Sequence, residues 1–256
     1  MVVDLSPLWI SLKTAGLATL VTCLTGIATA YWMLGYRGRW KSLIEGIFVS
    51  PLILPPTVVG FLLLLLFGKN GLLGQFMAQF DFTIVFTWYA AVITATVVAF
   101  PLMYKTALGA FEQVDRSLLQ VAQTLGASRG HIFWRLLLPL SMPGILAGTM
   151  LAFARTLGEF GATLMLAGNI PGQTQTIPMA IYFAVEAGAM EEAWLWVIMI
   201  MTISLSSIMA VNLWQQPQNV EDRVLGGCRR WRRAACPRFR PSSASRDPCP
   251  RARPRY

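Results

Sequence analysis

Residues 84–104 read IVFTWYAAVITATVVAFPLMY, and this stretch decides the fold class because it contains no charged side chain. As a helix it would extend for roughly 30 Å, which matches the thickness of the hydrocarbon core of a bilayer. Four further stretches have a similar length and are mostly apolar, at roughly 10–34, 47–67, 144–167 and 193–214. The sequence therefore predicts an all-α membrane protein, a bundle of about five transmembrane helices.

The composition agrees with this class. The 256 residues are 55% hydrophobic and 13% charged, whereas soluble domains carry about 25% charged residues. Residues 215–256 contain 11 Arg and three acids, so they supply +8 of the net charge of +9. We therefore expect a nearly neutral transmembrane domain over 1–214 and a basic, disordered cytoplasmic tail over 215–256. The high net charge belongs to this tail and does not indicate a nucleic-acid partner.

The charges between the spans predict the orientation of the bundle. Basic residues follow the first span (Arg37, Arg39, Lys41), the third span (Lys105, Arg116, Arg129, Arg135) and the fifth span. The loop after the second span has only Lys69, and residues 168–192 have no Lys or Arg. Because basic loops stay in the cytoplasm, we expect the N-terminus outside and the C-terminus inside.

Two spans carry irregular features. The span 47–67 contains Pro51, Pro55 and Pro56, which predict a kink or a break. The span 144–167 contains Arg155 and Glu159, which lie on one helix face within reach of a salt bridge. Charged residues within a span indicate function by default. This pair could contact an anion or could be a structural pair, and the structural pair is the favoured interpretation.

The sequence offers little that could perform bond-breaking chemistry. It has one histidine, His131, no phosphate-binding loop, and no C-x-x-C spacing among its four cysteines. A membrane-embedded enzyme would need a metal or an acid–base cluster, so we expect no enzyme and no cofactor. A secondary ion-coupled carrier would need paired ionisable groups near the midplane and usually internal repeats. The chain offers one pair and no repeat.

Residues 106–143 form the one long polar segment between spans, and its apolar residues follow a helical period. The first stripe is Leu118, Leu119, Val121, Ala122 and Leu125, and the second is Ile132, Phe133, Leu136 and Leu137, ending before Pro139. Gly126 separates them. We predict two short helices joined at this glycine, which could dock into another protein or lie on the bilayer surface.

The spacing within this segment resembles the cytoplasmic signature of ABC-importer permeases, in which E-A-A is followed by glycine and then by I-x-L-P. The corresponding residues here are Gln120, Val121, Ala122, Gly126, Leu136, Leu138 and Pro139. The spacing matches throughout, while Gln120 replaces the acid and Val121 replaces the first alanine. The resemblance implies that these residues couple the membrane domain to an ATPase.

Three other stretches are similar to molybdate-transport permeases. They are 50–60 (SPLILPPTVVG), 153–163 (FARTLGEFGAT) and 168–178 (GNIPGQTQTIP), and the likeness extends over about 8–214. Sulfate permeases share parts of this pattern, so a permease for sulfate or another oxyanion is the alternative. The resemblance identifies residues 1–214 as a permease domain in the bacterial inner membrane.

The resemblance also implies the partners of the chain. A second permease copy would complete a homodimeric pathway within the membrane lipid. Cytoplasmic ATPase subunits would dock on the coupling segment, and an external substrate-binding protein would deliver the anion.

Overall fold

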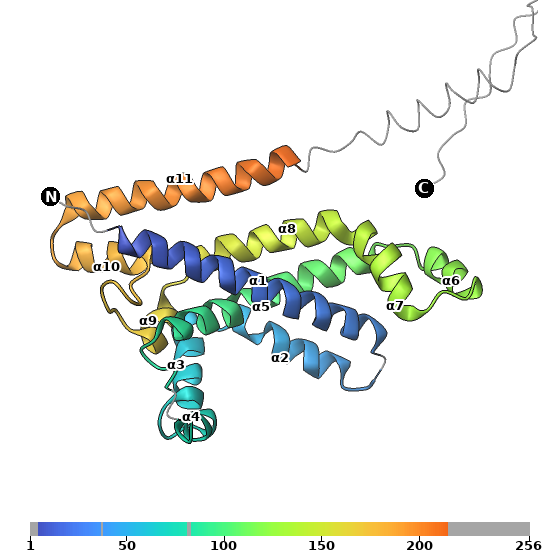
Figure 1. Ribbon diagram of the computed structural model, residues 1–256, viewed down its shortest axis with the longest axis horizontal. Coiled ribbons are helices and arrows are strands. Elements are labelled where there is room, and N and C mark those ends of the chain that lie inside the picture. Colours follow the sequence, from blue (N-terminus) through green and yellow to red (C-terminus); the bar gives the residue numbers. More distant parts are fainter. Residues whose placement is uncertain (1–4, 37, 81–82, 215–256) are drawn as a thin grey trace, which may run out of the picture. The chain divides into compact units, whose positions relative to one another are not determined.

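The computed structural model describes residues 5–36, 38–80 and 83–214, and every regular element in these ranges is a helix (Figure 1). This confirms the predicted all-α class. The predicted tail, residues 215–256, lies outside the described residues.

The long helices follow the predicted spans. Among the described residues, α1 (Ser6–Gly35), α5 (Trp88–Glu112) and the continuous helix Arg129–Leu157 are each long and apolar enough to cross a bilayer. The fifth predicted span is α11 (Met190–Trp214), a helix of 25 residues. With the broken second span, this gives up to four candidate spans by length and composition among the described residues, and α11 is a further long helix at the position of the fifth predicted span.

The second span is broken, as its prolines predict. Helix α2 (Lys41–Ile53) and helix α3 (Pro56–Phe67) meet at an angle of 114°. Leu54 and Pro55 are extended at the break, and Pro56 begins α3, where a missing backbone N–H costs nothing. Pro51 lies inside α2 and does not break it. After α3 the chain forms the short helix α4 (Leu72–Ala78).

The second coupling helix does not end before Pro139, so that prediction was wrong. Helix α7 (Arg129–Ile132) continues through the π-helical turn η1 (Phe133–Leu137) into α8 (Leu138–Leu157). Proline inside a helix normally clashes with the carbonyl four residues earlier. The wider π turn, which ends at Leu137, includes Arg135 and relieves this crowding at the Arg135 carbonyl.

The fourth predicted span, 144–167, is also not one helix. Helix α8 ends at Leu157, residues 158–160 are non-helical, and α9 (Gly161–Ala167) follows. The Glu159 side chain accepts a hydrogen bond from the backbone N–H of Ala162 at 3.0 Å, which supports the start of α9. The apolar run is therefore divided by its own buried carboxylate. The short apolar helix α10 (Ile177–Glu186) precedes α11.

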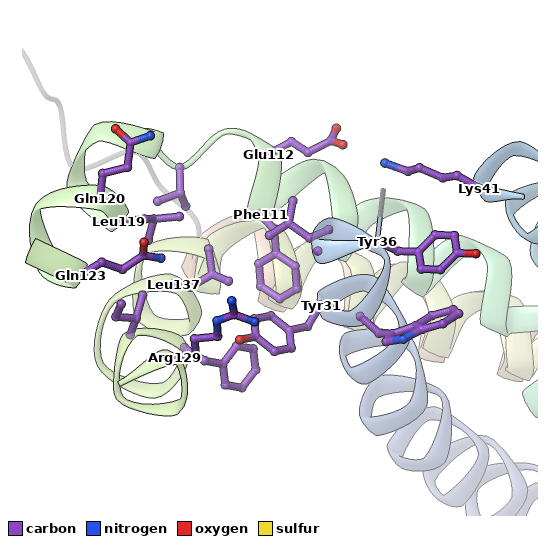
Figure 2. Close-up of a pocket in the computed structure, with 16 residues that line it drawn as sticks. Tyr31, Tyr36, Lys41, Phe111, Glu112, Leu119, Gln120, Gln123, Arg129 and Leu137 are labelled. Carbon is purple, nitrogen blue, oxygen red and sulfur yellow. The ribbon is translucent and has the colours of Figure 1, made fainter. Parts of the chain in front are cut away.

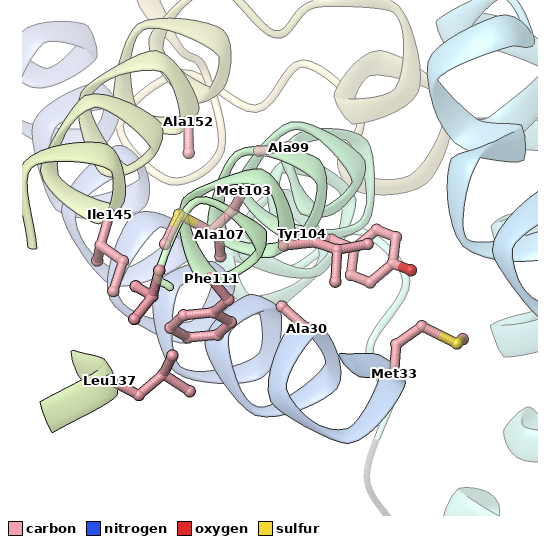
Figure 3. Packing of buried hydrophobic residues seen from close by; sticks show 12 residues of the cluster. Ala30, Met33, Ala99, Met103, Tyr104, Ala107, Phe111, Leu137, Ile145 and Ala152 are labelled. Carbon is pink, nitrogen blue, oxygen red and sulfur yellow. The ribbon is translucent and has the colours of Figure 1, made fainter. Parts of the chain in front are cut away.

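The main core lies where α1, α5 and α8 pack together (Figure 3). Its buried side chains include many alanines, which allow helices in a membrane to approach closely. Hydroxyl groups also link the helices: Thr19 lies 3.3 Å from Thr156, and the Trp88 indole donates to Thr14 at 2.8 Å. This core holds the ends of α5 and α8 in place, and the coupling segment connects those ends.

Candidate coupling segment and intramembrane ion pair

The coupling segment lies between α5 and α8, and its first helix is α6 (Arg116–Thr124). Asp115 caps α6, because its carboxylate accepts a hydrogen bond from the Ser117 backbone N–H at 2.8 Å. Hydrogen bonds from the Ser117 backbone and side chain lower the pKa of the exposed Asp115 carboxyl. The cap therefore persists across the physiological pH range and fixes where α6 begins.

Gly126 ends α6 in a specific C-terminal motif. Its φ is +82°, its N–H bonds to the Gln123 carbonyl at 3.0 Å, and the Ala127 N–H bonds to the Ala122 carbonyl at 3.1 Å. These two bonds and the left-handed residue form a Schellman motif, in which glycine is the preferred residue. The predicted helix–glycine–helix joint is confirmed. Ser128 then caps α7, with its hydroxyl 3.3 Å from the backbone N of His131.

Helix α6 presents apolar side chains that its own chain leaves uncovered. Leu118 is 50% exposed, Val121 56% and Leu125 82%, and Trp134 in η1 is 67% exposed. An exposed apolar set of this kind marks a surface that meets another protein or a membrane. The polar side of α6 carries Gln120 and Gln123.

A cavity of about 810 Å³ separates α6 from the ends of the spans (Figure 2). Its lining comes from α1 and its end (Tyr31, Trp32, Tyr36), the start of α2 (Lys41), the end of α5 (Phe111, Glu112), α6 (Leu119, Gln120, Gln123) and α7 (Arg129). Helix α6 packs against the main core through Leu119 and is otherwise joined to the bundle mainly through the chain on either side of it. Such a helix can shift against the spans more easily than a helix packed into the core.

The structure distributes the predicted coupling residues over three places. Gln120, Val121 and Ala122 lie on α6, Gly126 forms the joint, and Leu136, Leu138 and Pro139 lie where η1 passes into α8. Of the leucines between 136 and 138, it is Leu137 that is fully buried in the main core. The motif thus combines an exposed helix, a left-handed joint and the anchor of a long helix.

Several residues that shape this segment were not predicted. Asp115 and Ser128 are both N-caps, and their signal was present in the sequence, because each precedes a helical stripe. The cavity lining from α1 and α2 had no sequence signal, since it depends on tertiary packing.

Arg155 and Glu159 form the ion pair that their spacing allowed. The Arg155 Nη1 atom lies 2.8 Å from the Glu159 Oε2 atom. The Glu159 side chain is 1% exposed, whereas the Arg155 side chain is 29% exposed. The carboxylate thus bridges α8 and α9, through Arg155 on one side and the Ala162 N–H on the other.

Among the described residues, no group of three or more His, Cys, Asp or Glu side chains is placed to hold a metal ion. The two candidate sites are thus a helix with exposed apolar side chains and an ion pair with a buried carboxylate.

The sequence of the chain is similar to those of known membrane transport proteins. Residues 23–217 match the family described as binding-protein-dependent transport system inner membrane component. The molybdenum transport system permease protein ModB of Haemophilus influenzae is 47% identical over 163 residues, which cover 63% of this chain and 71% of that protein. ModB of Escherichia coli K12 is 45% identical over 178 residues, which cover 69% of this chain and 78% of that protein.

Solved structures share the fold at low sequence identity. The inward-facing MetNI methionine ABC transporter has a TM-score of 0.62 at 16% identity and covers 80% of this chain and 91% of the matched chain. A bacterial ABC transporter that imports alginate has a TM-score of 0.65 at 18% identity, covering 84% and 79%. With these matches the chain belongs to the family of binding-protein-dependent transport system inner membrane components.

Proposed function

We propose that the chain is the membrane-spanning subunit of an ATP-binding-cassette importer for molybdate. The observation that carries this proposal is the 45–47% identity to molybdenum transport permeases over about two thirds of the chain. Two copies would form the translocation pathway in the bacterial inner membrane, and an external substrate-binding protein would deliver the anion. A related solved transporter is described in complex with its periplasmic protein, which supports a partner of this kind.

The coupling segment is the docking site for a cytoplasmic ATPase subunit. Leu118, Val121 and Leu125 are exposed on α6 and need a covering surface. Burial of each such side chain contributes roughly 1.5–3 kcal/mol, enough for three of them to anchor a partner. Since Gln120 replaces the acid of the family signature, the contact depends on shape and apolar area rather than on charge at this position.

The helix from Arg129 to Leu157 carries movement from the docking site into the membrane. It is continuous, although one π turn interrupts its regular spacing. Because a helix is stiff along its axis, a shift of α6 and α7 would displace the far end of α8. The adjacent cavity leaves room for such a shift on the cytoplasmic side.

The orientation follows from the basic loops, with the coupling segment in the cytoplasm and the N-terminus outside. The chain itself performs transport, and ATP hydrolysis belongs to the partner subunit. Residues 1–214 form the permease domain, and residues 215–256 are a basic cytoplasmic extension.

Uptake of labelled molybdate tests the proposal. Cells that express the chain with its ATPase and binding protein should accumulate the label, and an excess of sulfate should compete poorly. Cells with a hydrolysis-deficient ATPase are the matched control. Equal competition by sulfate would assign the chain to sulfate or to oxyanions in general, and accumulation with the deficient ATPase would exclude an ATP-driven importer.

A further inference from the structure

The two broken spans of the chain meet each other inside the bundle. Helix α3 begins at the break in the second span, and α9 begins at the break in the fourth; the two helices lie side by side (Figure 1). A Cβ atom on Gly60 would lie 2.7 Å from the Ala162 Cα, and one on Gly161 would lie 3.1 Å from the Thr57 Cγ2. We call the residues 54–60 and 158–163 the junction. Glycine at these points lets the two helices approach this closely.

The Arg155–Glu159 pair lies at the edge of the junction. Glu159 Oε1 accepts a hydrogen bond from the Ala162 N–H, whereas Oε2 faces the Arg155 Nη1 atom at 2.8 Å in an ion pair and has no hydrogen-bond partner among the described residues. The guanidinium has five N–H donors, and the ion pair engages it through Nη1. The Arg155 side chain as a whole is 29% exposed, whereas its Glu159 partner is buried.

Arg155 also lies on the uncovered face of α8. Ala147 and Leu151 share this face at helical spacing and are exposed in the single chain. A face of α8 turned toward lipid would not carry arginine, because charged side chains in a span face the bundle interior or a water-filled cavity. In a two-copy importer, this face is therefore turned toward the pathway between the copies.

The geometry points to Arg155 as an intramembrane contact for the transported oxyanion, held in place by Glu159; this inference rests on the proposed function. The planar fork of a guanidinium matches a pair of oxyanion oxygens better than an ammonium does. Arg155 follows Arg129, the first residue of α7, by 26 residues, which places it about 39 Å along the helix from Arg129. In the proposed orientation it therefore lies toward the external side, where the anion is released by the binding protein.

The neighbouring Glu159 carboxylate changes how tightly Arg155 would hold an anion. A bare arginine in a dry environment would hold an anion tightly, whereas the Glu159 charge weakens that attraction. Transport requires a site that an anion can enter and also leave. Glu159 thus positions the guanidinium and keeps the contact weak enough for passage.

A matched pair of variants separates this role from a purely structural one. E159Q and the double variant R155Q/E159Q both lack the ion pair, and they differ only in the charge at position 155. We expect E159Q to retain molybdate uptake with a lower KM, and the double variant to lose uptake more than tenfold while its copurification with the ATPase is unchanged. Equal uptake by the two variants would overturn the proposal.

If E159Q does not reach the membrane, the charge-swapped variant R155E/E159R tests whether Arg155 contacts the anion. It keeps an ion pair but moves the cation by about one helical turn, so uptake should be lost in an intact complex. Uptake at the wild-type rate would contradict the proposal. If the wild-type complex itself transported no oxyanion, the proposed function would fail, which is a result distinct from the failure of Arg155.

Discussion

The substitution Gly126→Val tests whether the left-handed joint of the coupling segment is needed for docking of the ATPase. Gly126 has a φ of +82°, and a Cβ atom built on it meets nothing within 4 Å. The cost within the chain is therefore backbone strain alone, about 1–2 kcal/mol for a side chain in the left-handed region. A cost of this size lowers the population of the native joint by a factor of about 5 to 30.

The spans themselves should be unaffected, because the joint contributes no packing to the main core. We expect normal insertion of Gly126→Val, weakened copurification with a tagged ATPase subunit, and a fall in ATP-driven uptake of about tenfold. Gly126→Asn is the matched control, since asparagine tolerates a left-handed φ but adds a side chain. Its docking should be intermediate, because the partner approaches the joint closely.

Undiminished uptake by Gly126→Val would refute this reasoning. Wild-type docking by Gly126→Asn would also be informative, because it would reduce Gly126 to a helix cap and exclude a close approach of the partner.

Three further outcomes follow from the structure and the sequence. Cysteines at Gly38 and Pro171 should react with an impermeant thiol reagent from opposite sides of the membrane, and reaction of both from outside would contradict the five-span topology. Truncation after Trp214 should leave uptake largely intact, while loss of uptake despite normal insertion would assign a function to the tail. Asp115→Ala should weaken ATPase docking and Asp115→Asn should not, because asparagine also caps helices. The pKa of Asp115 is lowered, so the stabilisation by its carboxylate is present above the ordinary carboxyl pKa and is lost only as the pH falls through the lowered value. A change in docking between pH 6 and 8 that depends on Asp115 would contradict its assignment as a helix cap.

The fold was largely predictable because hydrophobic length is a strong signal. The apolar run at 84–104 predicts the third span, and Pro55 and Pro56 predict the break in the second span. Helix α5, which forms the third span, begins at Trp88, four residues after the start of the run, and continues to Glu112. Its continuation beyond the predicted span depends on packing of Ala107, Leu108 and Phe111 into the core, which hydropathy alone does not reveal.

The two errors both arose where a local feature of the backbone overrode the pattern of hydrophobic and proline residues. Pro139 was predicted to end a helix, but the π turn before it lets the helix continue. The run 144–167 was predicted to be one span, but the buried Glu159 starts a new helix within it. In the candidate site, the glycine joint was predictable from spacing, whereas the cavity behind α6 was not, because its lining comes from five helices.

Reconstitution into proteoliposomes shows whether ATP drives transport by this chain. The purified complex of this chain with its ATPase subunit would be inserted with the ATPase facing the lumen, and the binding protein and labelled molybdate would be added outside. We expect molybdate to enter only when ATP is present in the lumen. Entry driven by a proton or sodium gradient without ATP would contradict it and would make the chain a secondary carrier.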